Sequence, residues 1–128
     1  GVPGVVGTQH DQDGIRADGM VTMGTSMGAN LALNGCTAFV GCAGAVAISP
    51  GRNYFGVRTD EALMAGTPNL IIYADRDQYP RRDVPHMQAL EGFNGEVWAY
   101  PGRAHGIDLF PAEETLLADL IGWMQARL

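Results

Sequence analysis

The stretch from Met20 to Leu33 constrains the fold more than any other part of the sequence. It begins with a short apolar segment, continues as Gly24-Thr25-Ser26-Met27-Gly28, and ends in a run of small and apolar residues. This order predicts a strand, a sharp turn and a helix, with Ser26 at the tip of the turn. Glycine at positions 24 and 28 fits this prediction, because a side chain two residues from so tight a turn would collide with the crossing backbone.

Length and composition restrict the classes of protein to which the chain can belong. The 128 residues, 46% hydrophobic and 17% charged, suit a single domain over residues 1–128, in which residues 1–13 are the least defined segment. The net charge of −6 and the absence of a basic run argue against nucleic acid and anionic membranes as partners. No apolar run reaches the roughly 18 residues of a membrane span, and no signal peptide is visible, so we expect a cytoplasmic protein.

Apolar strands alternate with helices along the rest of the chain. Strands are expected at residues 43–48, 69–73 and 96–100, and a strand of two or three residues can form at Val5-Val6. Helices are expected from Met27 to a C-cap at Gly35, at 59–66, at 84–92 with Pro85 in the first turn, and at 111–128. Such βαβ units predict an α/β fold with three αβα layers and a short, mostly parallel sheet.

Two cysteines and one polar loop are the residues of this sequence that could carry redox or metal chemistry. Cys36 and Cys42 match neither a zinc pattern nor a C-x-x-C redox pair. Two buried free thiols are the favoured interpretation, and a disulfide is the alternative. His10, Asp11 and Asp13 alternate on a polar loop and make a poor cage without further ligands, so neither a metal nor a cofactor is expected.

Three reactive side chains follow three of the predicted strands in the order Ser26, Asp77, His105. The carboxyl ends of parallel strands share one edge of the sheet, where ligands bind. A serine needs a base to take its proton, His105 can take and return that proton, and a carboxylate on the other ring nitrogen fixes the tautomer. The Met27 N–H, at the start of the helix, is predicted to face an oxyanion forming beside Ser26.

The acid has alternatives to Asp77, namely Asp75, Asp83 and Asp108. Asp108 lies three residues after His105 and could equally begin a helix. Asp77 is favoured over Asp75 because a carboxylate a few residues beyond the strand can reach the next loop, whereas one at the strand edge points along it. Asp75 and Arg76 are interpreted as solvated loop charges.

At these residues the chain resembles the α/β-hydrolase superfamily, of the dienelactone hydrolase-like and small serine esterase kind. Residues 24–30 resemble the family's nucleophile elbow, residues 68–77 its strand and acid segment, and residues 100–106 its histidine loop. The resemblance covers residues 14–128 and implies a truncated α/β-hydrolase fold. The family's first strands and its His-Gly oxyanion motif have no counterpart in residues 1–19, so the second oxyanion donor is unassigned.

The resemblance implies a serine hydrolase that acts on small esters or lactones through an acyl-enzyme at Ser26. A non-catalytic remnant of the fold that binds a small ligand or a partner is the alternative, and acyl transfer to an acceptor other than water would use the same residues. The strand at 20–23 lies in mid-sheet in the family, so its edge would here be open. We expect residues 1–13 or a second copy of the chain to cover that edge, with a homodimer favoured.

Overall fold

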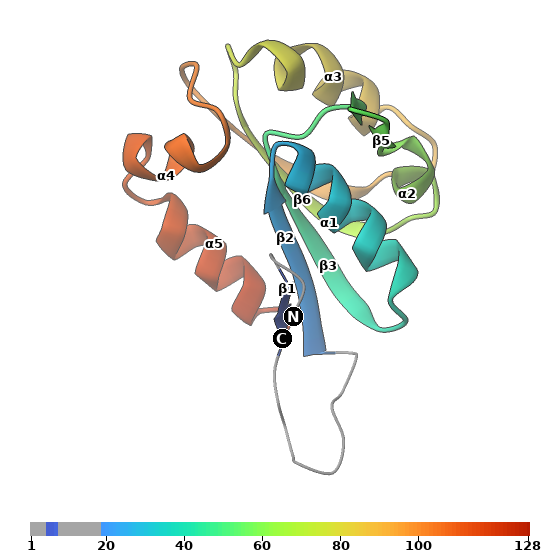
Figure 1. The fold of residues 1–128 in the computed structure, drawn as a ribbon. Coiled ribbons are helices and arrows are strands. Elements are labelled where there is room, and N and C mark those ends of the chain that lie inside the picture. Colours follow the sequence, from blue (N-terminus) through green and yellow to red (C-terminus); the bar gives the residue numbers. More distant parts are fainter. Residues whose placement is uncertain (1–4, 8–18) are drawn as a thin grey trace.

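The computed structural model describes residues 5–7 and 19–128. They contain a central five-stranded sheet with helices packed against it (Figure 1). The strand order is β1-β2-β3-β6-β7. Strands β2, β3, β6 and β7 are parallel, and β1 is antiparallel to β2. Their bounds are β1 Val5–Gly7, β2 Met20–Thr25, β3 Cys42–Ile48, β6 Pro68–Ala74 and β7 Asn94–Tyr100, so each strand expected from the sequence is present.

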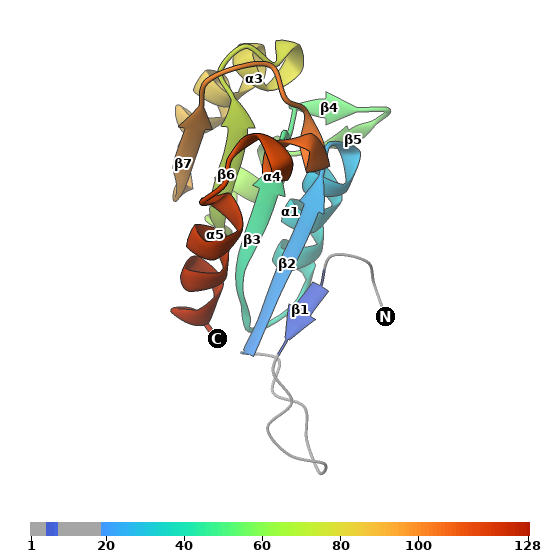
Figure 2. The ribbon, with the colours of Figure 1, turned by 90° about the vertical axis from the view of Figure 1, so that its left-hand side faces the viewer.

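Helices cover both faces of the sheet (Figure 2). One face carries α1 (Met27–Ala38), α2 (Asp60–Met64) and α3 (Gln78–Gln88). The other face carries α4 (Leu109–Ala112) and α5 (Leu116–Gln125), preceded by the 3₁₀ turn η2 (Gly106–Asp108). The predicted α/β fold with three layers and a mostly parallel sheet is therefore confirmed.

Alternation of side chains along β3 explains how one strand supports both layers. Ala45 and Ala47 pack into the core beneath α1, where their small size lets the helix lie close to the sheet. Val46 and Ile48 point to the opposite face and pack in the core that includes Trp123 of α5. All four strand residues are fully buried, which accounts for the uninterrupted apolar sequence of this strand.

Residues 5–7 supply part of the cover for the outer edge of β2. Val5 pairs with Thr22, Val6 with Val21 and Gly7 with Met20. Of the two covers expected from the sequence, the N-terminal segment is thus the one found over this half of the edge, and the preference for a second copy was wrong there. Beyond it, Met23–Thr25 has no strand partner on this side among the described residues.

Two helix boundaries differ from the sequence prediction. Helix α1 runs through Gly35 to Ala38, because the buried face of Leu33 continues to Cys36 and burial outweighs the low helix propensity of glycine. Helix α3 begins at Gln78, six residues before the expected start at 84, and Pro85 lies inside it. Pro85 was expected in the first turn of this helix, but Pro80 is the proline in that position. A proline is tolerated in the first turn because its missing N–H would have no partner within the helix there.

Two further segments are more divided than expected. The predicted helix at 111–128 is interrupted at residues 113–115, so that α4 and α5 are separate. The apolar face predicted for this segment is found on α5, where Leu116, Leu120 and Trp123 are buried, whereas Leu117 is exposed. The segment 52–58 contains the hairpin β4 (Asn53–Tyr54) and β5 (Val57–Arg58), two short strands beyond those predicted from the sequence. In the described part of the chain, no helix is long and apolar enough to cross a membrane.

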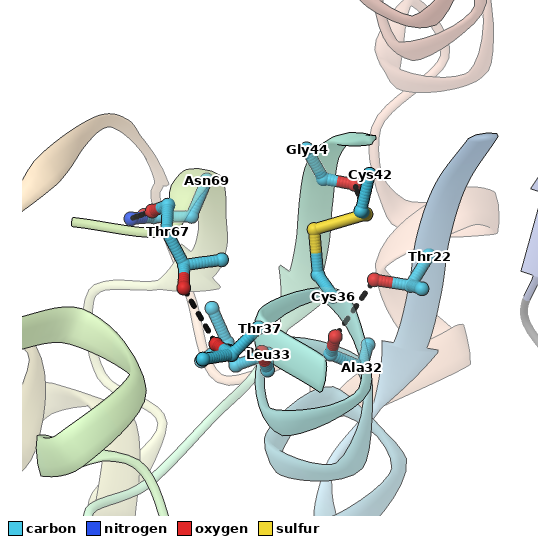
Figure 3. The surroundings of a disulfide bond; sticks show 9 residues. All are labelled: Thr22, Ala32, Leu33, Cys36, Thr37, Cys42, Gly44, Thr67 and Asn69. Carbon is cyan, nitrogen blue, oxygen red and sulfur yellow. Dashed lines mark hydrogen bonds between the residues drawn. A yellow bond between two sulfur atoms is a disulfide. The ribbon is translucent and has the colours of Figure 1, made fainter. Parts of the chain in front are cut away.

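Cys36 and Cys42 form a disulfide, so the favoured interpretation as free thiols was wrong (Figure 3). The bond joins the last turn of α1 to the first residue of β3, with Cα atoms 5.4 Å apart. Helix α1 extends two residues past Cys36, and the chain then turns back at once into β3. This tight return, invisible in the cysteine spacing, is what brings the two sulfur atoms together.

Candidate active site

Ser26 stands at the tip of the turn between β2 and α1, in a backbone conformation that few residues other than glycine adopt. Its φ is 57° and its ψ is −122°. The Ser26 N–H donates to the carbonyl of Ile48 at 2.8 Å, and its own carbonyl accepts from the Ala29 N–H at 3.0 Å. Bonds to β3 and to the first turn of α1 therefore hold the strained residue in place.

The two flanking glycines have different roles. A Cβ on Gly24 would collide with the carbonyl of Gly28, so the crossing of strand and helix requires glycine at position 24, as expected. A Cβ on Gly28 would meet none of the described atoms within 4 Å. The expected steric need for glycine at 28 is thus absent from the described residues, and it is the Gly28 backbone that restricts position 24.

The imidazole of His105 lies between the other two predicted site residues. Its Nε2 is 2.9 Å from Ser26 Oγ, and its Nδ1 is 2.6 Å from Asp77 Oδ2. With the proton on Nδ1, that N–H donates to the carboxylate and Nε2 accepts from the serine hydroxyl. The side chain of Asp77 is 9% exposed and that of His105 is 41% exposed, so one side of the imidazole faces solvent.

Asp77 owes its position to the turn between β6 and α3. Its N–H donates to the carbonyl of Ala74, the last residue of β6, at 3.0 Å. Its carbonyl accepts from the Arg81 N–H at 2.9 Å, which makes Asp77 the N-cap residue of α3. The early start of α3 therefore fixes the direction in which the carboxylate leaves the backbone.

Within the described residues, none of the other three candidate acids hydrogen-bonds to the imidazole. Asp75 Oδ1 accepts from the Gly102 N–H at 3.0 Å, so this side chain braces the loop that carries His105 and is more than a solvated charge. Asp108 precedes α4 as its N-cap and is exposed.

Asp83 is buried and accepts from the N–H of Arg52, the residue before the β4–β5 hairpin. Burial acts to raise the pKa of its carboxyl, but hydrogen bonds from Arg82 and from the Arg52 N–H outweigh burial and leave that pKa below its usual range. Of the four acids, Asp77 is the one that meets the imidazole.

The Met27 N–H is the first of α1, and the hydrogen bonds of the described residues include none that it donates. Among the described residues it therefore has no acceptor, and it directly follows Ser26 in the chain. A second donor cannot be assigned within the described residues. His10, Asp11 and Asp13, considered above as metal ligands, lie outside that part of the chain.

Sequence reasoning missed Asn30, which ties the hairpin to the helix that follows Ser26. Asn30 is fully buried; its Oδ1 accepts from the Gly51 N–H at 3.2 Å, and its Nδ2 donates to the carbonyl of Val57 at 2.9 Å. An asparagine on the buried face of a predicted helix, one turn after the turn serine, was the signal that could have revealed it.

Tyr54 connects the same hairpin to the end of β3. Its hydroxyl donates to the carbonyl of Ser49 at 3.2 Å. Burial, together with the nearby carboxylates of Asp77 and Asp83, raises the pKa of Tyr54 to about 12. The phenol therefore stays protonated and keeps donating over the whole neutral range.

A polar cavity of about 720 Å³ lies elsewhere, between the hairpin, α2 and α3. Its lining includes Arg52 and Asp60, which form an ion pair at 3.0 Å, and it includes neither Ser26 nor His105. We therefore place the candidate active site at the hydrogen-bonded side chains and not in this cavity.

Comparison with known proteins identifies the fold. The structure superimposes on the esterase Pf2001 of Pyrococcus furiosus with a TM-score of 0.62 and 14% identity, covering 84% of this chain and 52% of that one. Superposition on SOBER1 of Arabidopsis thaliana gives a TM-score of 0.64 and 21% identity, covering 90% and 56%. An esterase domain from Rhodothermus marinus matches with a TM-score of 0.52 and 11% identity, over 62% of this chain and 47% of that one.

The chain has the α/β-hydrolase fold. It spans about half the length of these similar structures. No protein-family model and no curated protein sequence matches it. At this level of identity the likeness to α/β-hydrolases concerns the fold alone. A catalytic activity has to be argued from the side chains that follow β2, β6 and β7.

Proposed function

We propose that the chain is a serine hydrolase of the carboxylesterase or lactonase type, acting on small esters through an acyl-enzyme at Ser26. One observation carries the proposal: a hydroxyl, an imidazole and a carboxylate from three separate segments lie in hydrogen-bonding sequence, at 2.9 Å and 2.6 Å. Two of the similar structures are described as esterases, which supports the same reaction class.

The proposed first step is attack of Ser26 Oγ on the ester carbonyl carbon. Nε2 of His105 takes the hydroxyl proton as the new C–O bond forms, and the carboxylate of Asp77 stabilises the resulting imidazolium. The Met27 N–H, which the described residues leave free, is the proposed donor to the oxyanion. His105 then returns the proton to the departing alcohol, and the acyl group stays on Ser26.

In the second step, water replaces the alcohol. His105 takes a proton from the water as it attacks the acyl carbon, and the bond to Ser26 Oγ breaks as that oxygen regains the proton. Because 41% of the His105 side chain is exposed, water can reach the imidazole directly. For a lactone, the departing alcohol remains part of the same molecule, and the product is a hydroxy acid.

A fluorophosphonate probe tests the proposal, because it reacts preferentially with a serine that a neighbouring base activates. The sequence contains two serines, Ser26 and Ser49, so peptide mass spectrometry assigns the adduct without ambiguity. We expect labelling of Ser26, none in Ser26→Ala, and a loss of at least 10³-fold in rate in His105→Ala.

His86 provides the matched control for the histidine variant. It lies on the exposed side of α3, with 42% of its side chain accessible, and contacts Asp60 instead of the site. His86→Ala should be labelled at the wild-type rate. Intact protein that is folded but unlabelled would refute the hydrolase and leave the alternative of a non-catalytic module that binds a small ligand or a partner.

We also propose that the chain forms a homodimer. The outer edge of β2 at Met23–Thr25 has no strand partner among the described residues, and Met27 and Leu31 of the adjacent helix are 41% and 53% exposed. An open strand edge beside exposed apolar side chains favours pairing. Sedimentation equilibrium at high concentration should give twice the chain mass, and a strictly monomeric protein would contradict the proposal.

A further inference from the structure

Ser49 is a buried polar residue beside the candidate site that the proposed mechanism does not use. It directly follows β3, is fully buried and has a φ of 57°. Ser26, directly after the neighbouring strand β2, has the same φ. A left-handed conformation is unfavourable for serine, so the surrounding bonds must hold Ser49 in place as they hold Ser26.

Each polar group of Ser49 has a partner on a different segment. Its N–H donates to the carbonyl of Ile72 on β6 at 2.7 Å. Its carbonyl accepts from the Tyr54 hydroxyl of the hairpin at 3.2 Å. Its Oγ accepts from the Gly106 N–H at 2.8 Å, in a buried bond that crosses 57 positions of the sequence. Ser49 is therefore the point at which the sheet, the hairpin and the segment after His105 are joined.

The bond to Gly106 is important because few other hydrogen bonds of the described residues hold the loop that carries His105. At its start, the loop is braced by exposed contacts, with Gly102 bonded to the Asp75 carboxylate at 3.0 Å and to the Arg76 N–H at 2.8 Å. At its end, apart from the bonds of the imidazole itself, the Ser49 contact is the one hydrogen bond within the described residues that ties residues 103–106 to the sheet.

We propose that Ser49 is a positioning residue that keeps the His105 imidazole aligned with Ser26. The inference rests on the proposed function, since it specifies how the base of that reaction is held. Gly106 has a φ of 61° and no side chain to anchor, so its N–H is the group through which the segment can be fixed. Because small displacements of reacting groups lower rates steeply, loss of this anchor should slow the proton transfer while leaving probe binding unchanged.

Two variants separate the hydroxyl from the backbone strain. Ser49→Ala removes the acceptor and keeps the strained conformation, whereas Ser49→Gly removes the acceptor and relieves the strain, which keeps the test valid should the alanine variant fold poorly. In both, we expect the maximal rate of fluorophosphonate labelling to fall about tenfold, with no change in the probe concentration giving half-maximal rate.

Thr22→Val is the matched control. Thr22 lies within β2, four positions before Ser26; it is 3% exposed, and its hydroxyl donates to the Ala32 carbonyl at 2.7 Å. The variant loses a buried hydroxyl without touching the His105 loop, so it should lower stability but not the labelling rate. An equal fall in rate in Thr22→Val would overturn the proposal, because a general loss of packing would then explain the effect.

Amide exchange and imidazole resonances give a readout that does not depend on catalysis. Exchange of the Gly106 amide should accelerate about tenfold in both Ser49 variants and not in Thr22→Val, and the His105 ¹⁵N chemical shifts should change with it. Unlabelled wild-type protein would refute the proposed function, while these measurements would still decide whether Ser49 holds His105. Unchanged Gly106 exchange would overturn the inference in either case, and so would an unchanged labelling rate in the Ser49 variants if wild type is labelled.

Discussion

Replacing Asp77 by asparagine tests the electrostatic part of the site, because the substitution removes a charge and preserves the shape of the side chain. In wild type, the carboxylate lies 2.6 Å from Nδ1 of His105 and is largely buried. It fixes the proton on Nδ1 and stabilises the imidazolium formed when Ser26 gives up its proton. An asparagine amide can do neither, since it is uncharged and can turn its NH₂ group toward the ring.

The expected effect can be estimated from the geometry. Coulomb's law with an effective dielectric constant of about 20 gives roughly 6 kcal/mol for unit charges at 2.6 Å. Because 41% of the His105 side chain is exposed, water screens part of that interaction. At about 1.4 kcal/mol per factor of ten, we expect the second-order rate constant for fluorophosphonate labelling to fall 10³- to 10⁴-fold, roughly the size seen when such a carboxylate is replaced by its amide.

Asp75→Asn is the matched control, two residues away and with the same chemical change. Its side-chain oxygen can still accept the Gly102 N–H, so labelling should fall by no more than about threefold. Circular dichroism of both variants establishes that they are folded. A folded Asp77→Asn protein labelled within tenfold of the wild-type rate would refute the assignment of Asp77. A larger loss of labelling rate in Asp75→Asn than in Asp77→Asn would show that Asp75 is the acid of the site.

Three other perturbations address the framework of the site. Gly24→Ala places a Cβ against the Gly28 carbonyl and should lower the free energy of unfolding by at least 2 kcal/mol, roughly the range for overpacking; a denaturant titration that matches wild type would disprove this. Reduction of the Cys36–Cys42 disulfide, whose cysteines are 6 positions apart, should lower that free energy by about 2 kcal/mol, since a short loop is released; equal midpoints would contradict it. The pKa of Tyr54 is raised from 10.0 to about 12, so its contribution to stability is complete below pH 10 and is lost as the pH rises through 12. Wild type should therefore lose stability between those values more steeply than Tyr54→Phe, and parallel curves would rule this out.

Strand positions could be predicted because each depends on local sequence. The run from Ala43 to Ile48 is apolar throughout, as a strand buried on both faces must be, and β3 occupies it. Ser26 could be singled out in the same way, since the glycine spacing around it requires a strand, a turn and a helix. Helix ends were less predictable: Gly35 signals a C-cap, yet contacts from the sheet carry α1 past it.

The choice among carboxylates shows where local reasoning stops. Nothing in the local sequence distinguishes Asp75, Asp77 and Asp83 as partners of a histidine. Asp77 was favoured because a carboxylate a few residues beyond the end of a strand can reach the next loop. The actual partners of these three carboxylates are respectively the Gly102 N–H, the His105 ring and the Arg52 N–H, which lie 27, 28 and 31 positions away. No local pattern encodes which distant group ends up beside which carboxylate.

By itself the sequence determined the order of strands and helices, the turn that exposes Ser26, and the edge of the sheet at which reactive side chains collect. Tertiary structure alone decided that Cys36 meets Cys42, that Ser49 meets Gly106, and how far α1 and α3 extend. The physical reason is the distance along the sequence over which each kind of interaction acts. Backbone propensity and side-chain alternation act over a few residues, whereas a bond between distant segments exists only after packing has set the distance between them.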